Sequence, residues 1–443
     1  MGPRAKIDPV TPAASRSNAN GTRERAALVG LFTGSSRQFD PEHSLDELAG
    51  LASAAGATVA LRVLQKNPKP DPATFLGSGK VATLAVACDE ARADVVIFDN
   101  ELSPAQLRNL EAALQRKVLD RTQLILDIFA RRARTREGKL QVELAQLKYL
   151  MPRLVGAGTA LSRLGGGIGT RGPGETKLET DRRRIRYRIS MLSQEIDTVR
   201  RRRSQLRERR RKSSVPTVAL VGYTNAGKTT LFNALTGDVA VASDALFVTL
   251  DPLVRKVKLP DRRELLVSDT VGFIERLPHS LVAAFRATLE EVAAADLLLH
   301  VIDASSAERE RHIAAVRSVL EEVGAERVPV LEVFNKCDQL EAGERARIRA
   351  VYPAALCVSA LTGEGRDELI AVLEGRLALD TTVVHFDFAS DDEEDRKKIG
   401  YLYRVGRIRR HVATDGRVSI EAEVPRRVVE RLQGHATRPG AHR

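Results

Sequence analysis

One eight-residue stretch restricts the fold of this chain more than any other. After the apolar residues 218–221 the sequence fits the pattern GxxxxGK followed by serine or threonine. A buried strand that leads into such a glycine turn points backbone N–H groups, and the positive end of the next helix, at an anion. The stretch therefore predicts a P-loop that holds a phosphate chain, formed by Gly222, Tyr223, Thr224, Asn225, Ala226, Gly227, Lys228 and Thr229.

Two P-loop side chains have expected roles, and a later motif completes the phosphate site. Lys228 would reach the β and γ phosphates, and the Thr229 hydroxyl would take a position on Mg²⁺. After the strand expected at residues 264–268, an aspartate can hold the same ion through water while a glycine N–H faces the γ phosphate. This DxxG motif consists of Asp269, Thr270, Val271 and Gly272.

A loop between these two motifs is the expected position of a mobile switch. A threonine in that interval can contribute a second hydroxyl ligand to Mg²⁺. Thr249 is assigned as this ligand only because it lies between the two phosphate motifs in the sequence. The predicted switch residues are Phe247, Val248, Thr249, Leu250 and Asp251.

The choice of base is predicted by a third motif, at the end of the apolar strand 330–334. In the pattern NKxD, Asp338 accepts hydrogen bonds from guanine N1 and N2, which adenine cannot donate, so the wrong base leaves a carboxylate unpaired. A backbone N–H after the next strand would meet the guanine carbonyl. The predicted base-binding residues are Asn335, Lys336, Cys337, Asp338, Val358, Ser359 and Ala360.

Two positions bear on the mechanism. Phe273 stands where Ras-like GTPases have the glutamine that orients the attacking water, so slow intrinsic hydrolysis that depends on a partner is expected. Asn225 is similar to the asparagine of GTPases that use K⁺ in place of an arginine finger, so K⁺ is a second cofactor hypothesis beside Mg²⁺.

Length and patterning predict an α/β chain of several domains. The 443 residues with 43% hydrophobic composition suggest about three folded units. Alternating strand and helix patterns predict an N-terminal α/β domain at 26–136, a helical hairpin with a glycine-rich tip at 137–212, the P-loop domain at 213–378 and a small α+β domain at 379–433. Residues 1–25 and 434–443 are predicted to be disordered tails. Gly77 to Lys80 fits only part of a P-loop pattern and is interpreted as a loop that leads into a helix.

Charge is concentrated in one segment of the chain. Residues 182–212 hold 14 lysines or arginines and three acidic residues, almost the whole excess of a chain with net charge +12. Such uncompensated charge favours a polyanion as partner over a solvated helix face. With the glycine-rich tip, it predicts RNA contacts at Arg163, Gly165, Gly166, Gly167, Gly169, Arg171, Lys177, Arg182, Arg183 and Arg184.

Several segments together resemble the HflX family of GTPases, which is related to the Obg GTPases. The resemblance rests on the glycine loop at 161–179, on 118–132, on 96–110 and on the P-loop. It implies a bacterial-type cytoplasmic GTPase that binds the large (50S) ribosomal subunit and splits or rescues ribosomes. It also implies that the N-terminal domain and hairpin reach rRNA near the peptidyl transferase region.

Alternatives within this interpretation stay open. The nucleotide could drive a switch on the ribosome, or the basic hairpin could act as an RNA-binding module whose affinity the nucleotide only tunes; a role in large-subunit assembly is a third reading. We expect a monomer that binds GTP and GDP. No apolar run approaches the roughly 18 residues of a membrane span, so a cytoplasmic location, with at most peripheral membrane association, is expected. Three widely spaced cysteines indicate neither a metal site nor a disulfide framework.

Overall fold

The computed structural model describes residues 6–9, 23–32, 41–66, 69–154, 173–212, 215–237, 246–247, 249–250, 252–259, 264–276, 289–377, 381–414, 416–425, 429, 432 and 436–437. The chain divides into two compact units. The first is mainly Met1–Thr198 and includes Asp244–Leu250, and the second holds most of the remaining chain.

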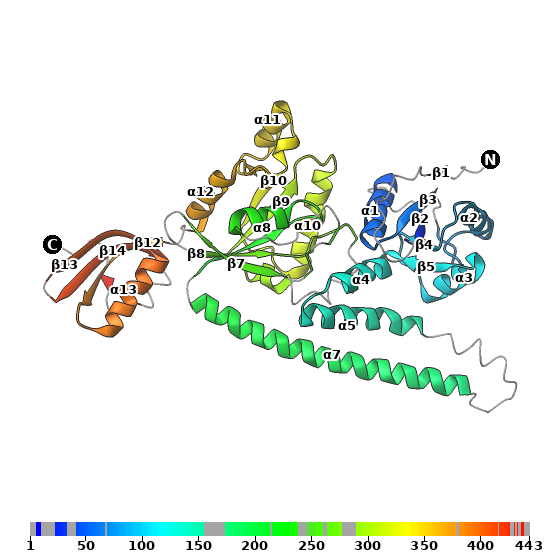
Figure 1. Ribbon diagram of the computed structural model, residues 1–443, viewed down its shortest axis with the longest axis horizontal. Coiled ribbons are helices and arrows are strands. Elements are labelled where there is room, and N and C mark those ends of the chain that lie inside the picture. The colour runs from blue at the N-terminus through cyan, green and yellow to red at the C-terminus, as the bar shows by residue number, and fades with distance from the viewer. Residues whose placement is uncertain are drawn as a thin grey trace. The chain divides into compact units, whose positions relative to one another are not determined.

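A mostly parallel sheet organises the first unit. Strands β2 (Arg25–Phe32), β3 (Thr58–Lys66), β4 (Val95–Phe98) and β5 (Lys117–Asp120) are parallel in the order β3-β2-β4-β5. Helices α1 (Pro41–Ala54) and α4 (Arg121–Arg132) pack together on one face, and α2 (Ser78–Glu90) and α3 (Pro104–Leu114) cover the other (Figure 1). This is the doubly wound arrangement that alternating strands and helices predict.

The two chain ends differ from the sequence prediction. Residues 6–9 of the expected N-terminal tail form strand β1 (Lys6–Pro9), antiparallel to β3. Ala436–Thr437 in the expected C-terminal tail forms β15 against β12 (Thr381–Ala389). Both short strands use the unpaired N–H and C=O groups of a sheet edge, and that opportunity arises only in the folded chain.

Two long helices form the predicted hairpin. Helix α5 (Arg136–Arg153) begins after Thr135, whose hydroxyl accepts the Gly138 N–H, and α7 (Pro173–Lys212) lies antiparallel to it. Leu140 and Leu144 of α5 pack on Leu192 of α7 along the seam. Ion pairs flank the seam, Arg136 with Glu195 at 3.2 Å and Arg188 with Glu143 at 2.7 Å.

A six-stranded sheet carries the P-loop in the second unit. Its order is β11-β10-β9-β6-β8-β7, with only β7 antiparallel to its neighbour. Helices α8 (Lys228–Thr236) and α12 (Arg366–Leu377) share a core with one face, and α10 (Arg309–Val323) and α11 (Ala342–Val351) lie on the other. The strands are β6 (Thr217–Val221), β7 (Leu253–Lys258), β8 (Glu264–Asp269), β9 (Leu297–Asp303), β10 (Val330–Asn335) and β11 (Leu356–Cys357).

A separate antiparallel sheet closes the chain. Its order is β13-β14-β12-β15, and α13 (Glu393–Val405) packs on it over a core that includes Phe386, Leu402 and Ile420. A β-hairpin joins β13 (Arg407–Thr414) to β14 (Arg417–Pro425), with Gly416 at φ +82° in the turn.

The predicted fold class is confirmed: a P-loop domain between an α/β domain with a helical hairpin and a small α+β domain. The domain boundaries themselves stay a prediction. Among the helices that the structure describes, none combines the length and the apolar character needed to cross a membrane.

Candidate functional site

The P-loop geometry depends on glycine at two positions. Strand β6 ends at Val221, and Gly227 caps the N-terminus of α8 with φ +88°. A Cβ at Gly222 would lie 2.2 Å from the Val301 carbonyl oxygen, and one at Gly227 would lie 2.1 Å from Asn335 Nδ2. Backbone this close to its neighbours leaves no room for side chains, so the loop keeps a cradle that exposes its N–H groups.

Lys228 lies buried beneath the loop. Its Nζ donates to the carbonyl oxygens of Gly222 at 3.1 Å and Tyr223 at 2.8 Å. Burial lowers the pKa of Lys228 to about 8, against the opposing effect of the Asp269 carboxylate. A bound polyphosphate would supply negative charge and restore the charged form of the lysine.

Thr229 and Asp269 place two oxygen atoms that can bind a metal ion next to each other, at the carboxyl end of β8. The Thr229 hydroxyl donates to Asp269 Oδ2 at 2.8 Å, and Asp269 is fully buried at the end of β8. A hydroxyl and a carboxylate are hard oxygen ligands of the kind that Mg²⁺ takes beside phosphate oxygens. The residues present therefore fit the magnesium ion that a P-loop GTPase fold implies.

The DxxG motif is held against the P-loop by backbone hydrogen bonds. The Thr224 N–H donates to the Phe273 carbonyl at 2.7 Å, and the Phe273 N–H donates to the Gly222 carbonyl at 3.1 Å. A Cβ at Gly272 would lie 2.8 Å from Thr224 Cγ2 and 3.0 Å from Lys228 Nζ. Phe273 is buried, so an apolar ring fills the position where Ras-like enzymes have glutamine.

Asn335 joins the base-binding loops to the P-loop. Its Nδ2 donates to the Ala226 carbonyl at 2.9 Å, and its Oδ1 accepts the Ala360 N–H at 2.9 Å. The Ala360 N–H, which we expect to meet the guanine carbonyl, is thus engaged by Asn335 in this structure. Asp338 is exposed on the short 3-10 turn Cys337–Gln339 and Ser359 is buried. The structure brings the P-loop, the DxxG motif and both base-binding segments together.

The predicted switch segment is described only in part. Phe247, Thr249 and Leu250 fall in the first unit, where the Phe247 ring meets Phe129 of α4 edge-on with centroids 4.7 Å apart. Val248 and Asp251 lie outside the described residues. The role of Thr249 as a magnesium ligand therefore stays a prediction.

Most predicted RNA contacts cannot be placed. Arg163, Gly165, Gly166, Gly167, Gly169 and Arg171 lie outside the described residues, as does the side chain of Lys177. On α7, Arg182 is half-buried and Arg183 and Arg184 are exposed.

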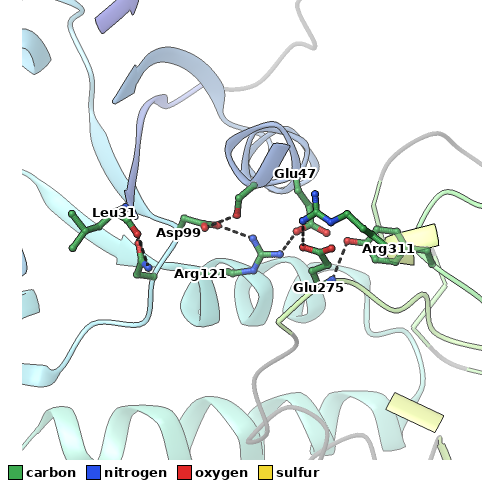
Figure 2. A network of polar contacts seen from close by, with 9 residues as sticks. Leu31, Glu47, Asp99, Arg121, Glu275 and Arg311 are labelled. Carbon is green, nitrogen blue, oxygen red and sulfur yellow. Dashed lines mark hydrogen bonds and ion pairs between the residues drawn. The ribbon is translucent and has the colours of Figure 1, made fainter. Parts of the chain in front are cut away.

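Sequence reasoning missed several partners of the site. Lys336 pairs with Asp303 at 2.6 Å, and Asp303 stands at the carboxyl end of β9, a position that could have drawn attention. Glu275 pairs with Arg311 of α10 at 3.2 Å (Figure 2). No local pattern indicated this pair, because Arg311 is one of many charged residues on an amphipathic helix.

A second polar cluster lies at the carboxyl ends of the strands in the N-terminal sheet. Figure 2 shows Arg121 reaching Asp99 and Glu47, with Arg121 Nη1 2.8 Å from Asp99 Oδ1. Ser44 donates to the other Asp99 oxygen at 2.7 Å. Doubly wound domains often bind ligands at this edge. Here the buried side chains bond mainly to one another, which fits a structural role.

Comparisons with known proteins agree with this site. Residues 42–130 match a family described as GTP-binding GTPase N-terminal, 132–210 its middle region, and 217–336 a family described as 50S ribosome-binding GTPase. The chain is 47% identical to the GTPase HflX of Caldanaerobacter subterraneus subsp. tengcongensis, over 93% of each chain. It is 46% identical to the GTPase HflX of Escherichia coli K12, over 91% of this chain and 94% of the relative.

Solved structures of GTP-binding proteins have a partial likeness to this chain. A GTP-binding protein from the archaeon Sulfolobus solfataricus in complex with GDP matches 80% of this chain and 98% of its own, at 25% identity and a TM-score of 0.41.

Proposed function

The chain belongs to the HflX family of GTPases and hydrolyses GTP, and from that premise we propose that it acts on the large ribosomal subunit. In this proposal the bound nucleotide is a switch that splits, rescues or regulates ribosomes. The family description of residues 217–336 as a 50S ribosome-binding GTPase supports this partner.

The nucleotide would lie across the loops that Asn335 joins. Phosphates would take the N–H groups of the P-loop and the Lys228 ammonium, and the Gly272 N–H would face the γ phosphate. Asp338, exposed on the 3-10 turn after β10, would accept hydrogen bonds from the N1–H and N2–H groups of guanine. Thr229 and Asp269 would hold Mg²⁺, the aspartate through water, and the ion would supply positive charge to the phosphates.

Phe273 makes hydrolysis dependent on a partner in this proposal. An apolar ring cannot orient a water molecule, and its backbone is bonded to the P-loop on both sides. Slow intrinsic turnover and faster turnover on the ribosome are therefore expected. Equal rates with and without ribosomes would contradict this part of the proposal.

The observation that best supports a ribosomal partner is the basic surface of α7. Arg183, Arg184 and Arg186 are exposed in a segment with 14 basic and three acidic residues. On the hairpin, Arg188 is paired with Glu143, but most of the segment's positive charge has no acidic residue within the segment to balance it. A polyanion such as rRNA would neutralise this surface and release counterions.

Sedimentation of intact ribosomes tests the proposal. Ribosomes are mixed with this protein and GTP, GDP or a non-hydrolysable GTP analogue, and subunit peaks and GTPase rate are read together. We expect the analogue and GTP, but not GDP, to increase the subunit fraction. Unchanged ribosomes with every nucleotide would exclude splitting. Equal dissociation by Asp338→Asn under limiting GTP would favour an RNA-binding module over a switch.

We also propose that K⁺ supports hydrolysis through Asn225. This residue is exposed in the P-loop with φ +61°, a backbone conformation that asparagine tolerates better than most residues. Replacing K⁺ by Na⁺ at constant ionic strength should lower the rate in the wild type and leave Asn225→Ala unaffected. An unchanged wild-type rate would remove the hypothesis.

A further inference from the structure

The second residue of the P-loop holds the segment that follows the DxxG motif. We propose that Tyr223 is a positioning residue for GTP hydrolysis, which with His312 and Arg311 of α10 fixes residues 273–276 against the P-loop. The DxxG glycine would thereby be kept in place for the γ phosphate.

The Tyr223 side chain contacts both α10 and the segment that follows the DxxG motif. Its ring stacks on the His312 imidazole, with centroids 3.8 Å apart and planes inclined by 15°. Its hydroxyl oxygen accepts the backbone N–H of Glu275 at 2.9 Å. Tyr223 is 7% exposed, so water competes little for this hydrogen bond.

An ion pair of Arg311 also holds residues 273–276 to α10. Glu275 Oε2 lies 3.2 Å from Arg311 Nη2, and Arg311 Nη1 lies 2.8 Å from Glu308 Oε2 (Figure 2 shows Glu275 and Arg311). Glu275 itself is buried at 7% exposure. Arg311 and His312 are neighbours in the first turns of α10, so one short stretch of helix supplies both the ion pair and the stacking ring.

Strand register explains why this matters for the glycine. Leu220 pairs with Asp269 between β6 and β8, whereas Tyr223 pairs with Phe273. The DxxG side thus has one residue more than the P-loop side, and the chain must bulge between the two pairs, as in a β-bulge. Gly272 lies in that bulge, within reach of Lys228 and Thr224. Its position is set at one end by β8 and at the other by the contacts of Tyr223.

Rates of the isolated full-length protein test the proposal, which keeps the test independent of the ribosome. Tyr223→Phe retains the stacked ring and removes only the hydroxyl. We expect kcat for GTP to fall about three- to tenfold, the equivalent of one hydrogen bond, with KM and GDP affinity changed less than twofold. Tyr352→Phe is the control for the loss of a tyrosine hydroxyl as such, because the Tyr352 hydroxyl donates to the Glu310 carboxylate at 2.6 Å and does not contact residues 273–276 or the P-loop.

The stacking contact gives a second test. His312→Ala should lower kcat in the same way, and His312→Phe should restore most of the rate because it keeps an aromatic face against Tyr223. A wild-type kcat in Tyr223→Phe would overturn the proposal. So would a loss confined to KM or to thermal stability, since that would make the tyrosine a structural support of the P-loop.

Discussion

Asn335 Nδ2 donates a hydrogen bond of 2.9 Å to the carbonyl oxygen of Ala226, which ties the base-binding motif to the P-loop. The same side chain accepts the Ala360 N–H through Oδ1 and is 2% exposed. One buried amide therefore satisfies groups on two other loops, and neither loop can move without breaking a buried hydrogen bond.

Asn335→Ala should weaken the site before any nucleotide is present. It leaves the Ala226 carbonyl and the Ala360 N–H without their partner, at a cost of roughly 1–3 kcal/mol for the buried carbonyl and less for the half-buried N–H. Thermal unfolding of the nucleotide-free protein should show a lower Tm, and GDP titration a weaker affinity. Asn335→Asp is a sharper variant, because it keeps the acceptor for Ala360 and places a carboxylate against the Ala226 carbonyl. Loss of affinity at an unchanged Tm would mean that Asn335 acts only on the nucleotide.

Gly227→Ala should abolish nucleotide binding, and α8 provides its own control. Gly227 and Gly237 flank the helix with φ +88° and +71°, so both substitutions carry a similar backbone strain, about 1 kcal/mol. A Cβ at Gly227 would lie 2.1 Å from Asn335 Nδ2, whereas nothing lies within 4 Å of one at Gly237. GDP affinity should be lost in Gly227→Ala and retained in Gly237→Ala. Equal losses would show that strain, not the contact with Asn335, decides the outcome.

The lowered pKa of Lys228 predicts a pH dependence of nucleotide affinity. Burial places that pKa near 8, while bound phosphates favour the charged lysine and raise its pKa. Because the nucleotide prefers the protonated form, affinity should be level below pH 8 and fall as pH rises above it. At pH 8.5 a substantial part of the free protein therefore carries neutral Lys228, so binding GDP should take up part of a proton.

Calorimetry in buffers of different ionisation enthalpy measures this proton uptake. The terminal phosphate of GDP is ionised at pH 8.5 and contributes little there. A constant affinity from pH 7 to 9 with no proton uptake would contradict the assignment of a buried, phosphate-binding role to Lys228.

The contiguous parts of the site were predictable, and the partners brought from other elements were not. Residues 222–229 and 335–338 carry their chemistry in local patterns, since a P-loop needs glycines at fixed spacing and guanine needs a carboxylate at a strand end. The stacking of His312 on Tyr223 depends on where α10 packs, which no periodicity specifies. Likewise, the pairing of β1 depends on β3 lying at the edge of the parallel strands, where its backbone groups can accept another strand.

The predicted switch shows the same limit in a different way. Its sequence position identified a segment between two phosphate motifs, but the contacts of Phe247 depend on tertiary packing. In the folded chain that ring is buried against Phe129, at 2% and 1% exposure. Phe247, two residues before the proposed magnesium ligand Thr249, thus packs into the N-terminal α/β domain and anchors its segment there.

Phe247→Ala should release this anchor while the N-terminal domain stays folded. The substitution removes an edge-to-face pair worth about 0.5–1.5 kcal/mol together with the buried area of one ring, and leaves Phe129 in its own helix. Hydrogen exchange at the amides of Leu246, Thr249 and Leu250 should rise, whereas that of β2 and β4 should not change. Phe247→Leu is the matched control, since it keeps most of the apolar contact and should give an intermediate rate. Exchange that stays at the wild-type level in Phe247→Ala would show that other contacts hold the segment.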